Sequence, residues 1–258
     1  MRKTILTLIA LATTGIASTA YAGETYIGAS AGINLQNDSK NKGKFTTAVP
    51  ASVAFPAIPL DTPLEWRTKF DNSIDANLMI GHRFDNGFRL ELQGFYNKAN
   101  VNRHSDLAVG GTVIDGLDSA VLTRGAASAT NPTVGTVLST DAGKLKNYGA
   151  FANAFYDVKA GSFMPYLGAG IGFQHENVKF IPSGVPVADQ GKTVLAYQAM
   201  AGATYKISPS FELFGQYTYR IADRAKVDLT LLPAKLGVKS KQSIVNVGFR
   251  IPFGGGGQ

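Results

Sequence analysis

Three histidines, at positions 82, 104 and 175, are the scarcest residues in the chain that could support acid–base or metal chemistry. The chain has no cysteine, which excludes disulfide scaffolds, iron–sulfur proteins, cysteine-based zinc sites and cysteine enzymes. No two histidines have metal-ligand spacing. His175 and Glu176 are the one candidate for a hydrolytic site, but neighbours in a strand face opposite sides, so Glu176 is badly placed to orient His175. We therefore predict no catalytic residues, no metal site, no cofactor and no enzymatic activity.

Charged residues form a second pattern that could carry chemistry. Seven of them share the polar face of alternating segments and lie near short turns, so they should reach one depth: Arg83, Arg89, Glu91, Asp157, Lys206, Glu212 and Arg250. Buried charges persist when they are paired and hydrogen-bonded. We predict an ionic cluster that closes this level as a structural plug, with a gate or narrow pore as the alternative reading.

The N-terminus has the form of a secretory signal peptide. A basic start (Met1-Arg2-Lys3) precedes the small and apolar residues 4–19, and Ala20 and Ala22 form an A-x-A cleavage site before Gly23. A retained membrane helix is the alternative. Removing Arg2 and Lys3 leaves 23 basic and 18 acidic residues, so the formal charge falls from +7 to +5. That charge is too small to indicate nucleic-acid binding.

The residues after the leader alternate with a period of two. In residues 25–36 the odd positions are mostly apolar and the even positions are small or polar, which is typical of a strand between two different environments. Seven further segments repeat the pattern: 73–84, 88–97, 146–157, 163–176, 192–207, 211–220 and 241–253. The polar faces are rich in Gly, Asn and Gln, and the apolar faces in Ala and Tyr. This composition favours eight membrane strands over a soluble all-β sandwich.

The connections between these segments alternate between long and short. The long ones are 37–72, 98–145, 177–191 and 221–240, and the short ones are 85–87, 158–162 and 208–210. Short periplasmic turns and long extracellular loops are typical of transmembrane β-barrels. Aromatic residues occur toward both ends of the apolar faces, as in the two interfacial girdles of such barrels. We predict an all-β, eight-stranded, antiparallel up-and-down transmembrane barrel over residues 23–253, followed by a Gly-rich tail at 254–258.

The last segment resembles the C-terminal signal by which outer-membrane barrels are recognised for assembly. Asn246, Gly248, Ile251 and Phe253 match its polar, glycine, apolar and aromatic places. The tail after Phe253 departs from the pattern, because the aromatic residue usually ends the chain.

Four segments together resemble the outer-membrane β-barrel surface antigens, which include opacity-type and rickettsial major surface antigens. They are residues 72–98, 165–173 (PYLGAGIGF), 196–220 and 246–253. The resemblance covers the strands, about half of the chain, and does not cover the long loops. The resemblance implies an exported protein of a Gram-negative-type outer membrane. It also implies a range of roles that runs from surface antigen and adhesin to small porin.

The long loops are where we expect function. The first contains a proline-punctuated apolar stretch from Ala48 to Trp66, which is either a contact site or a lid over the barrel mouth. The second is rich in small residues, and we expect it to be mobile and antigenic. The fourth carries basic residues that either touch lipopolysaccharide phosphates or form a solvated face, namely Arg224, Lys226, Lys235 and Lys239.

These patterns favour a monomeric surface antigen that presents its loops to a host or to the environment. The first alternative is a small porin that passes water and small solutes through a charged lumen. The remote alternative is a hydrolase that modifies lipid A. Expected partners are outer-membrane lipid and lipopolysaccharide, the barrel-assembly machinery and a host-surface ligand at the loops. No nucleic acid is expected.

Overall fold

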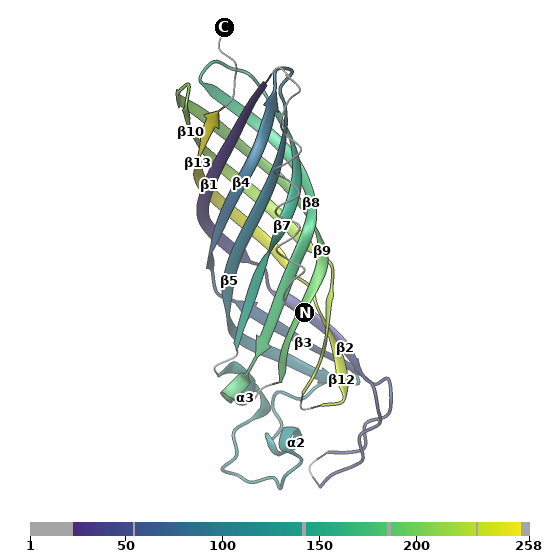
Figure 1. Ribbon diagram of the computed structural model, residues 1–258. Helices are drawn as coiled ribbons and strands as arrows, with labels where there is room; N and C mark the ends of the chain where they lie inside the picture. Colours follow the sequence, from purple (N-terminus) through teal and green to yellow (C-terminus); the bar gives the residue numbers. More distant parts are fainter. Residues whose placement is uncertain (1–22, 54, 141–142, 185–186, 231, 254–258) are drawn as a thin grey trace, which may run out of the picture.

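Eight antiparallel strands close into a barrel in the computed structural model, which describes residues 23–53, 55–140, 143–184, 187–230 and 232–253 (Figure 1). The strands are β1 (Gly23–Gln36), β4 (Ser73–Phe84), β5 (Phe88–Val109), β7 (Gly143–Asp157), β8 (Phe163–Phe180), β9 (Ala188–Ser208), β10 (Phe211–Ala222) and β13 (Lys241–Phe253). Pairing of β1 with β13, from Thr25 opposite Phe253 to Gln36 opposite Gln242, closes the ring. The predicted fold class is confirmed. The predicted leader, with Ala20 and Ala22, and the tail at 254–258 lie outside the described residues.

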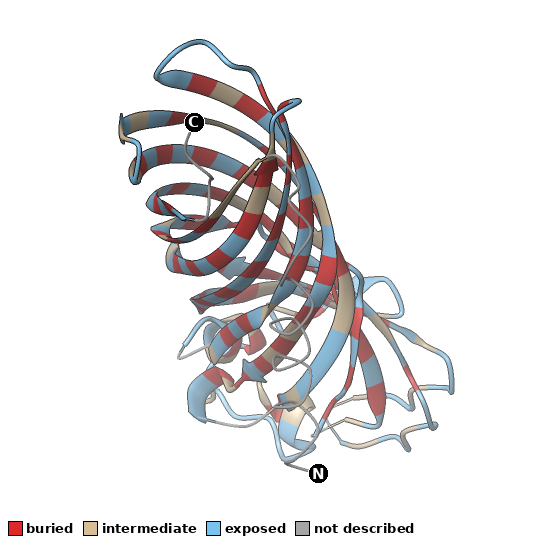
Figure 2. Ribbon diagram, turned by 45° about the horizontal axis from the view of Figure 1, so that its top comes forward, coloured by how far each residue is buried: buried red, intermediate tan, exposed pale blue. Residues whose placement is uncertain are grey.

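Within the apolar wall, burial alternates along the barrel strands and is opposite to that of a soluble protein (Figure 2). On β4 the outward Leu78 is 70% exposed, whereas the inward Asn77 is 3% exposed. The outer wall is therefore apolar and the lumen polar, which is the arrangement of a barrel in lipid.

Exposed aromatic side chains border the apolar wall on both sides. Toward the short turns, Phe88 lies opposite Tyr156 on the neighbouring strand. Toward the long connections, Tyr96 lies opposite Tyr148. Two such girdles mark the two membrane interfaces.

Four barrel strands continue beyond the outer girdle and take part in a second structure, which we call the head. Its sheet has the order β11-β12-β2-β3-β5, built from β2 (Ser39–Phe45), β3 (Pro63–Phe70), β11 (Ala225–Asp228) and β12 (Ala234–Val238). The far parts of β7, β8 and β9 complete its wall. The short elements β6 (Thr112–Val113), α2 (Ala120–Thr123), α3 (Val134–Ser139) and η1 (Pro182–Gly184) lie in the connections. None of the helices in the described ranges is long and apolar enough to cross a membrane.

The structure has shorter loops than the long connections predicted from the sequence, because strands occupy parts of those connections. The connection 37–72 contains β2 and β3, and 221–240 contains β11 and β12, while β5 and β8 run well past their predicted ends. The alternation was present, since Leu64, Trp66 and Thr68 all face inward. Charged outward residues such as Arg67 and Lys69 replace the apolar face there, because this wall contacts water instead of lipid.

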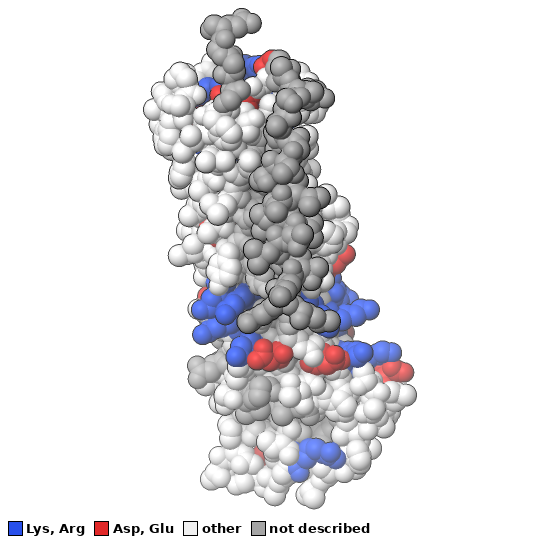
Figure 3. Space-filling model, viewed as in Figure 1, with Lys and Arg blue, Asp and Glu red and all other residues white. Residues whose placement is uncertain are grey.

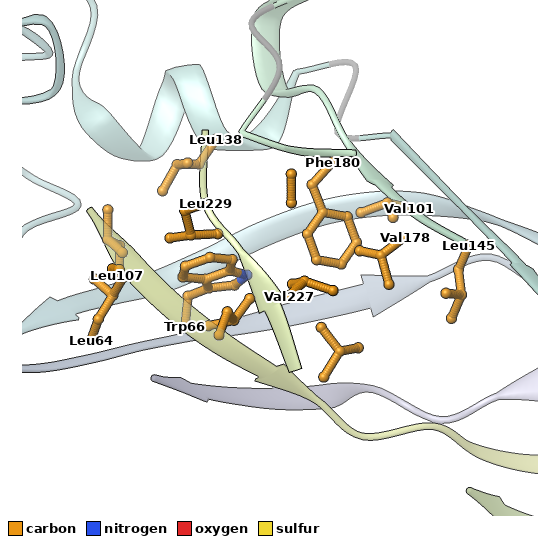
Figure 4. Packing of buried hydrophobic residues seen from close by; sticks show 14 of the residues in the cluster. Leu64, Trp66, Val101, Leu107, Leu138, Leu145, Val178, Phe180, Val227 and Leu229 are labelled. Atoms are coloured by element: carbon orange, nitrogen blue, oxygen red, sulfur yellow. The ribbon is translucent and has the colours of Figure 1, made fainter. Parts of the chain in front are cut away.

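A hydrophobic core fills the head (Figure 4). Trp66 is 6% exposed and packs among aliphatic and aromatic side chains from most of the head strands. The members labelled in Figure 4 are Leu64, Trp66, Val101, Leu107, Leu138, Leu145, Val178, Phe180, Val227 and Leu229. Val49, Phe55 and Ile58 pack against this core from the proline-punctuated stretch, so that stretch covers the head and Trp66 is not an exposed contact residue.

Candidate functional site: a filled lumen

An ion-pair network crosses the lumen at the short-turn end of the barrel. Arg83 contacts three carboxylates: Glu24 at 2.9 Å, Asp157 at 3.0 Å and Glu212 at 2.8 Å. Arg89 is 3.0 Å from Asp157 and 3.3 Å from Glu91. Lys206 lies 3.6 Å from Glu212 and 3.7 Å from Glu24. Most of these groups are almost fully buried, and Lys206, at 37%, is the most exposed of them.

Strand register brings these residues to one depth. Arg83 lies opposite Arg89 on the β4–β5 ladder, and Glu212 lies opposite both Lys206 and Arg250 on its two ladders. Six of the seven predicted cluster residues therefore meet in one network. Arg250 lies at the same depth without an ion pair in the described structure.

Arg250 is held by other contacts. Its Nη1 donates to Thr204 Oγ1 at 2.8 Å, and its guanidinium lies 3.9 Å from the ring centre of Phe214. Two of its nitrogens, Nε and Nη2, have no hydrogen-bond partner within the described residues. Facing an aromatic ring partly replaces the missing partners.

Two members of the network were missed from the sequence. Glu24 lies one residue before the expected start of the first strand, but its even position places it on the inner face of that strand. Tyr26 lies among small and polar residues on the same face, and its hydroxyl donates to Glu91 at 2.6 Å and accepts from Arg89 at 3.0 Å. The even positions of both residues, which place them on the inner face of the strand, could have identified them from the sequence.

Glycines on the inner wall make room for large side chains of the adjacent strands. A Cβ at Gly168 would overlap the ring of Phe155, and a Cβ at Gly202 would lie 2.6 Å from the ring of Tyr166. The occupants are mainly aromatic rings and come from neighbouring strands, because a small inner position directly beside a ring is the nearest free space.

Amide side chains form the next layer of the lumen. Gln198 Nε2 donates to Gln93 Oε1 and to Asn153 Oδ1, both at 2.8 Å. Gln93 Nε2 donates to Asn77 Oδ1 at 2.7 Å. These four residues are 3–4% exposed. The layer is therefore closed by direct contacts between side chains from β4, β5, β7 and β9.

A second charged pair lies above the amides. Arg220 Nη1 is 3.8 Å from Asp75, and its guanidinium lies 3.8 Å from the ring centre of Phe95. Arg220 Nε donates to Gln198 at 3.0 Å, which links this pair to the amide layer. Both residues fall on the polar faces of the predicted segments 73–84 and 211–220, but alternation does not show that they pair, because these segments are far apart in the chain.

The three histidines have separate contacts, and His175 and Glu176 do not form a hydrolytic site. His175 faces outward, with Nδ1 3.0 Å from Thr193 Oγ1, whereas Glu176 is fully buried on the inner side. His82 contacts Thr25 and His104 contacts Thr68. Within the described ranges no three His, Asp or Glu side chains are grouped for metal binding.

The four residues of the proposed assembly signal divide between the two faces of β13. Asn246 points inward and donates to Asp75 at 3.3 Å, and Gly248 lies against Phe214. Ile251 and Phe253 point outward and are 40% and 47% exposed. Recognition of this segment by the assembly machinery stays a prediction.

Comparisons with known proteins agree with this architecture. The model of the "Surface antigen" family matches residues 62–251. A curated relative described as an outer membrane protein of Gluconacetobacter diazotrophicus is 26% identical over 151 residues, which are 54% of this chain and 32% of the relative. The chain thus spans about a third of the length of that relative.

Solved structures similar to this chain include an outer membrane protein and a surface protein. OprG from Pseudomonas aeruginosa has a TM-score of 0.58 at 14% identity, covering 90% of this chain and 97% of that one. Neisserial surface protein A has a TM-score of 0.41 at 17% identity, covering 89% and 97%. At this identity the likeness to OprG shows the fold alone.

An apolar outer wall, two aromatic girdles and a polar lumen define an outer-membrane β-barrel. The family match identifies the chain more specifically than this class does, because it extends over residues 62–251. The chain belongs to the surface antigen family, and it is a protein of the outer membrane.

Proposed function

We propose that this protein is a closed barrel that anchors a folded extracellular head, and that the head is its interaction surface. The observation that carries the proposal is the filling of the lumen at successive depths. An ionic network, an amide layer and the Asp75–Arg220 pair follow one another, and the hydrophobic core of the head closes the outer end. Eight strands leave a lumen just wide enough for side chains.

A small porin would need a continuous wet path through these layers. Arg89, Glu212 and Arg250 are 0% exposed at the ionic level, and Leu64 and Leu236 are 0% exposed in the head. A solute would have to break paired charges at one end and open an apolar core at the other. This favours a structural and interaction role over transport.

The head provides the surface for such an interaction. It places the connections around β6, α2 and α3 at the end of the molecule farthest from the short turns (Figure 1). Packing against the head core holds the β2–β3 connection in place. Binding and catalytic residues of proteins are often carried by loops on a rigid scaffold, so a host-surface ligand is proposed for these connections.

Single-channel conductance of the refolded mature chain in a planar bilayer tests the closed lumen. We expect a silent barrel both for the wild type and for Arg89→Ala, because the layers above the ionic network remain in place. Heat-modifiable migration in electrophoresis confirms that the inserted barrel is folded. Stable unitary openings whose ion selectivity changes in Arg89→Ala would instead establish the porin alternative.

Surface display tests the interaction role. Cells that display the full protein are compared with cells that display a variant in which the β2–β3 and β5–β7 connections are shortened and all barrel strands are kept. The probes are immobilised extracellular-matrix proteins and host glycans. We expect adhesion of the first cells to at least one probe and its loss in the second. Equal adhesion of both would contradict the proposal.

A further inference from the structure

A cavity of about 770 Å³ lies on the outer wall of the barrel, over β5, β7 and β8. Lys98, Lys144, Lys146 and Lys179 contribute four ammonium groups to its lining. All four residues are exposed, so the cavity is open to the surroundings and is not part of the lumen. No step of the proposed function uses it.

Strand register sets the positions of the four lysines. Lys98 lies directly opposite Lys146 on the β5–β7 ladder. Two residues farther from the membrane, Lys144 lies directly opposite Lys179 on the β7–β8 ladder. Neighbouring strands are about 4.8 Å apart, and successive residues of one face are about 6.7 Å apart along a strand. The cavity wall therefore carries two short rows of like charge.

Like charges directly opposite each other destabilise a sheet. In the part of the chain that the structure describes, no carboxylate lies within ion-pair distance of Lys98, Lys144 or Lys146, and only Lys179 has a partner, Asp189 at 3.6 Å. Water solvates these exposed charges, and an anion bound at this wall would reduce the repulsion among them.

The depth of the cavity indicates the source of that anion. The adjacent outward row toward the membrane consists of Tyr96, Tyr148 and His175, which are register partners on the same three strands. The rings of Tyr148 and His175 are 4.9 Å apart and belong to the outer aromatic girdle. Figure 3 shows most Lys and Arg side chains of this face gathered in a band directly beyond the uncharged wall. Lysines at this depth face lipid headgroups.

We propose that this four-lysine cavity binds the phosphorylated headgroup of a glycolipid in the outer leaflet. Lysine ammonium groups bind phosphate as point charges, and two rows suit a headgroup that carries more than one phosphate. Asn100 and Asn177 line the same cavity and supply amides for hydrogen bonds to sugar or phosphate oxygens.

This site differs from the basic residues of the connection 221–240, for which the sequence left open either a phosphate contact or a solvated face. Arg224, Lys226, Lys235 and Lys239 do not line the cavity, and Lys235 is already 3.8 Å from Asp228. The β5–β8 wall is the better phosphate site because it combines concavity, girdle depth and three lysines without an ion pair in the described structure, although Asp189, the partner of Lys179, also lines the cavity.

The test uses the mature chain refolded in uncharged detergent micelles. Fluorescent bisphosphorylated lipid A is titrated into the wild type and into a variant with Lys98→Gln, Lys144→Gln, Lys146→Gln and Lys179→Gln. A matched control carries the same substitution at four lysines of the head, Lys42, Lys44, Lys226 and Lys235, and so removes the same charge elsewhere. Heat-modifiable migration verifies folding, which exposed lysines should not affect.

We expect the cavity variant to bind lipid A more than a hundredfold more weakly, since each lysine near a lipid surface contributes about fivefold. The head control should stay within about fivefold of the wild type. Dephosphorylated lipid A should bind the wild type as weakly as lipid A binds the cavity variant. Inorganic pyrophosphate should fail to displace lipid A at equal concentration.

Three results would overturn the proposal. Unchanged affinity of the cavity variant would remove the site. Equal weakening in the head control would show that only overall charge matters. Full displacement by pyrophosphate at equal concentration would identify a site for free phosphate instead of a lipid headgroup.

Discussion

Arg83 and Glu212 form a bidentate ion pair across the lumen, with Nη1–Oε1 at 2.8 Å and Nη2–Oε2 at 2.9 Å. Their strands, β4 and β10, are not neighbours, because β1 and β13 lie between them in the ring. The pair therefore links opposite parts of the wall through the interior. Glu212 is 0% exposed and Arg83 is 5% exposed, so solvent screens this pair little.

Glu212→Gln should destabilise the folded barrel by about 3–5 kcal/mol, because breaking a buried pair leaves an uncompensated buried charge. Urea unfolding of the protein in lipid vesicles, followed by far-UV circular dichroism, measures this loss. Glu65→Gln is the matched control, since Glu65 pairs with Lys42 at 3.1 Å on the exposed head and should contribute only about 0–1 kcal/mol. Similar losses in both variants would contradict a special role for the lumen pair.

Gly168→Ala should destabilise the barrel by about 1–3 kcal/mol, because the added methyl group overlaps the ring of Phe155 and a carbonyl on β7. Gly94→Ala is the control: nothing lies within 4 Å of a Cβ there, and the expected change is within about 0.5 kcal/mol. The same unfolding measurement compares the two. If the two variants were equally stable, the proposed fit between inner glycines and rings would be wrong.

Alternation was sufficient to predict the barrel, because lipid and lumen impose opposite polarity on successive residues. Leu78 and Asn77 of β4 show this contrast in one step. The head strands were missed because their outward residues, such as Arg67 on β3, contact water and so lack the apolar signature. Burial still alternates along the head strands, but only their inward residues are apolar.

Parity also predicted which charges enter the lumen, but it did not predict their partners. Arg83 and Glu212 were both assigned to one depth, and they do pair. Arg250 was assigned with them, yet it packs on Phe214. Side-chain partners depend on which strands face each other across the ring. A linear sequence pattern carries no information about the distance between two side chains across the lumen.

Asp118 should titrate below the ordinary pKa of an aspartate. Its carboxylate accepts hydrogen bonds from the backbone amides of Ala120 at 2.7 Å and Ser128 at 2.9 Å and from the side chain of Asn131, which lower the pKa of that carboxyl. The resulting local stability is present above the unfolded pKa of about 3.9 and is lost as the pH falls through the lower folded pKa.

Carbon NMR of the Asp118 carboxyl measures the midpoint of this titration directly. Hydrogen exchange of the Ala120 and Ser128 amides should accelerate through the same pH range after correction for intrinsic rates. Asn131→Ala removes one donor and should raise the midpoint. A midpoint at or above about 3.9 in the wild type would show that these hydrogen bonds do not hold the carboxylate.

Leu64→Ala tests whether the head has a core of its own. Leu64 is 0% exposed beside Trp66, the single tryptophan of the chain, so Trp66 emission reports on the head alone. Truncating a buried leucine should lower the stability of the head by about 2–5 kcal/mol. The red shift of the emission should then occur at lower urea concentration, while heat-modifiable migration of the barrel is unchanged.

Leu60→Ala is the control for Leu64→Ala, because Leu60 is 55% exposed and its loss should change stability by no more than about 0.5 kcal/mol. If barrel and head lost structure together in Leu64→Ala, the head would be a cooperative part of the barrel, and its role as a separately folded interaction surface would be contradicted.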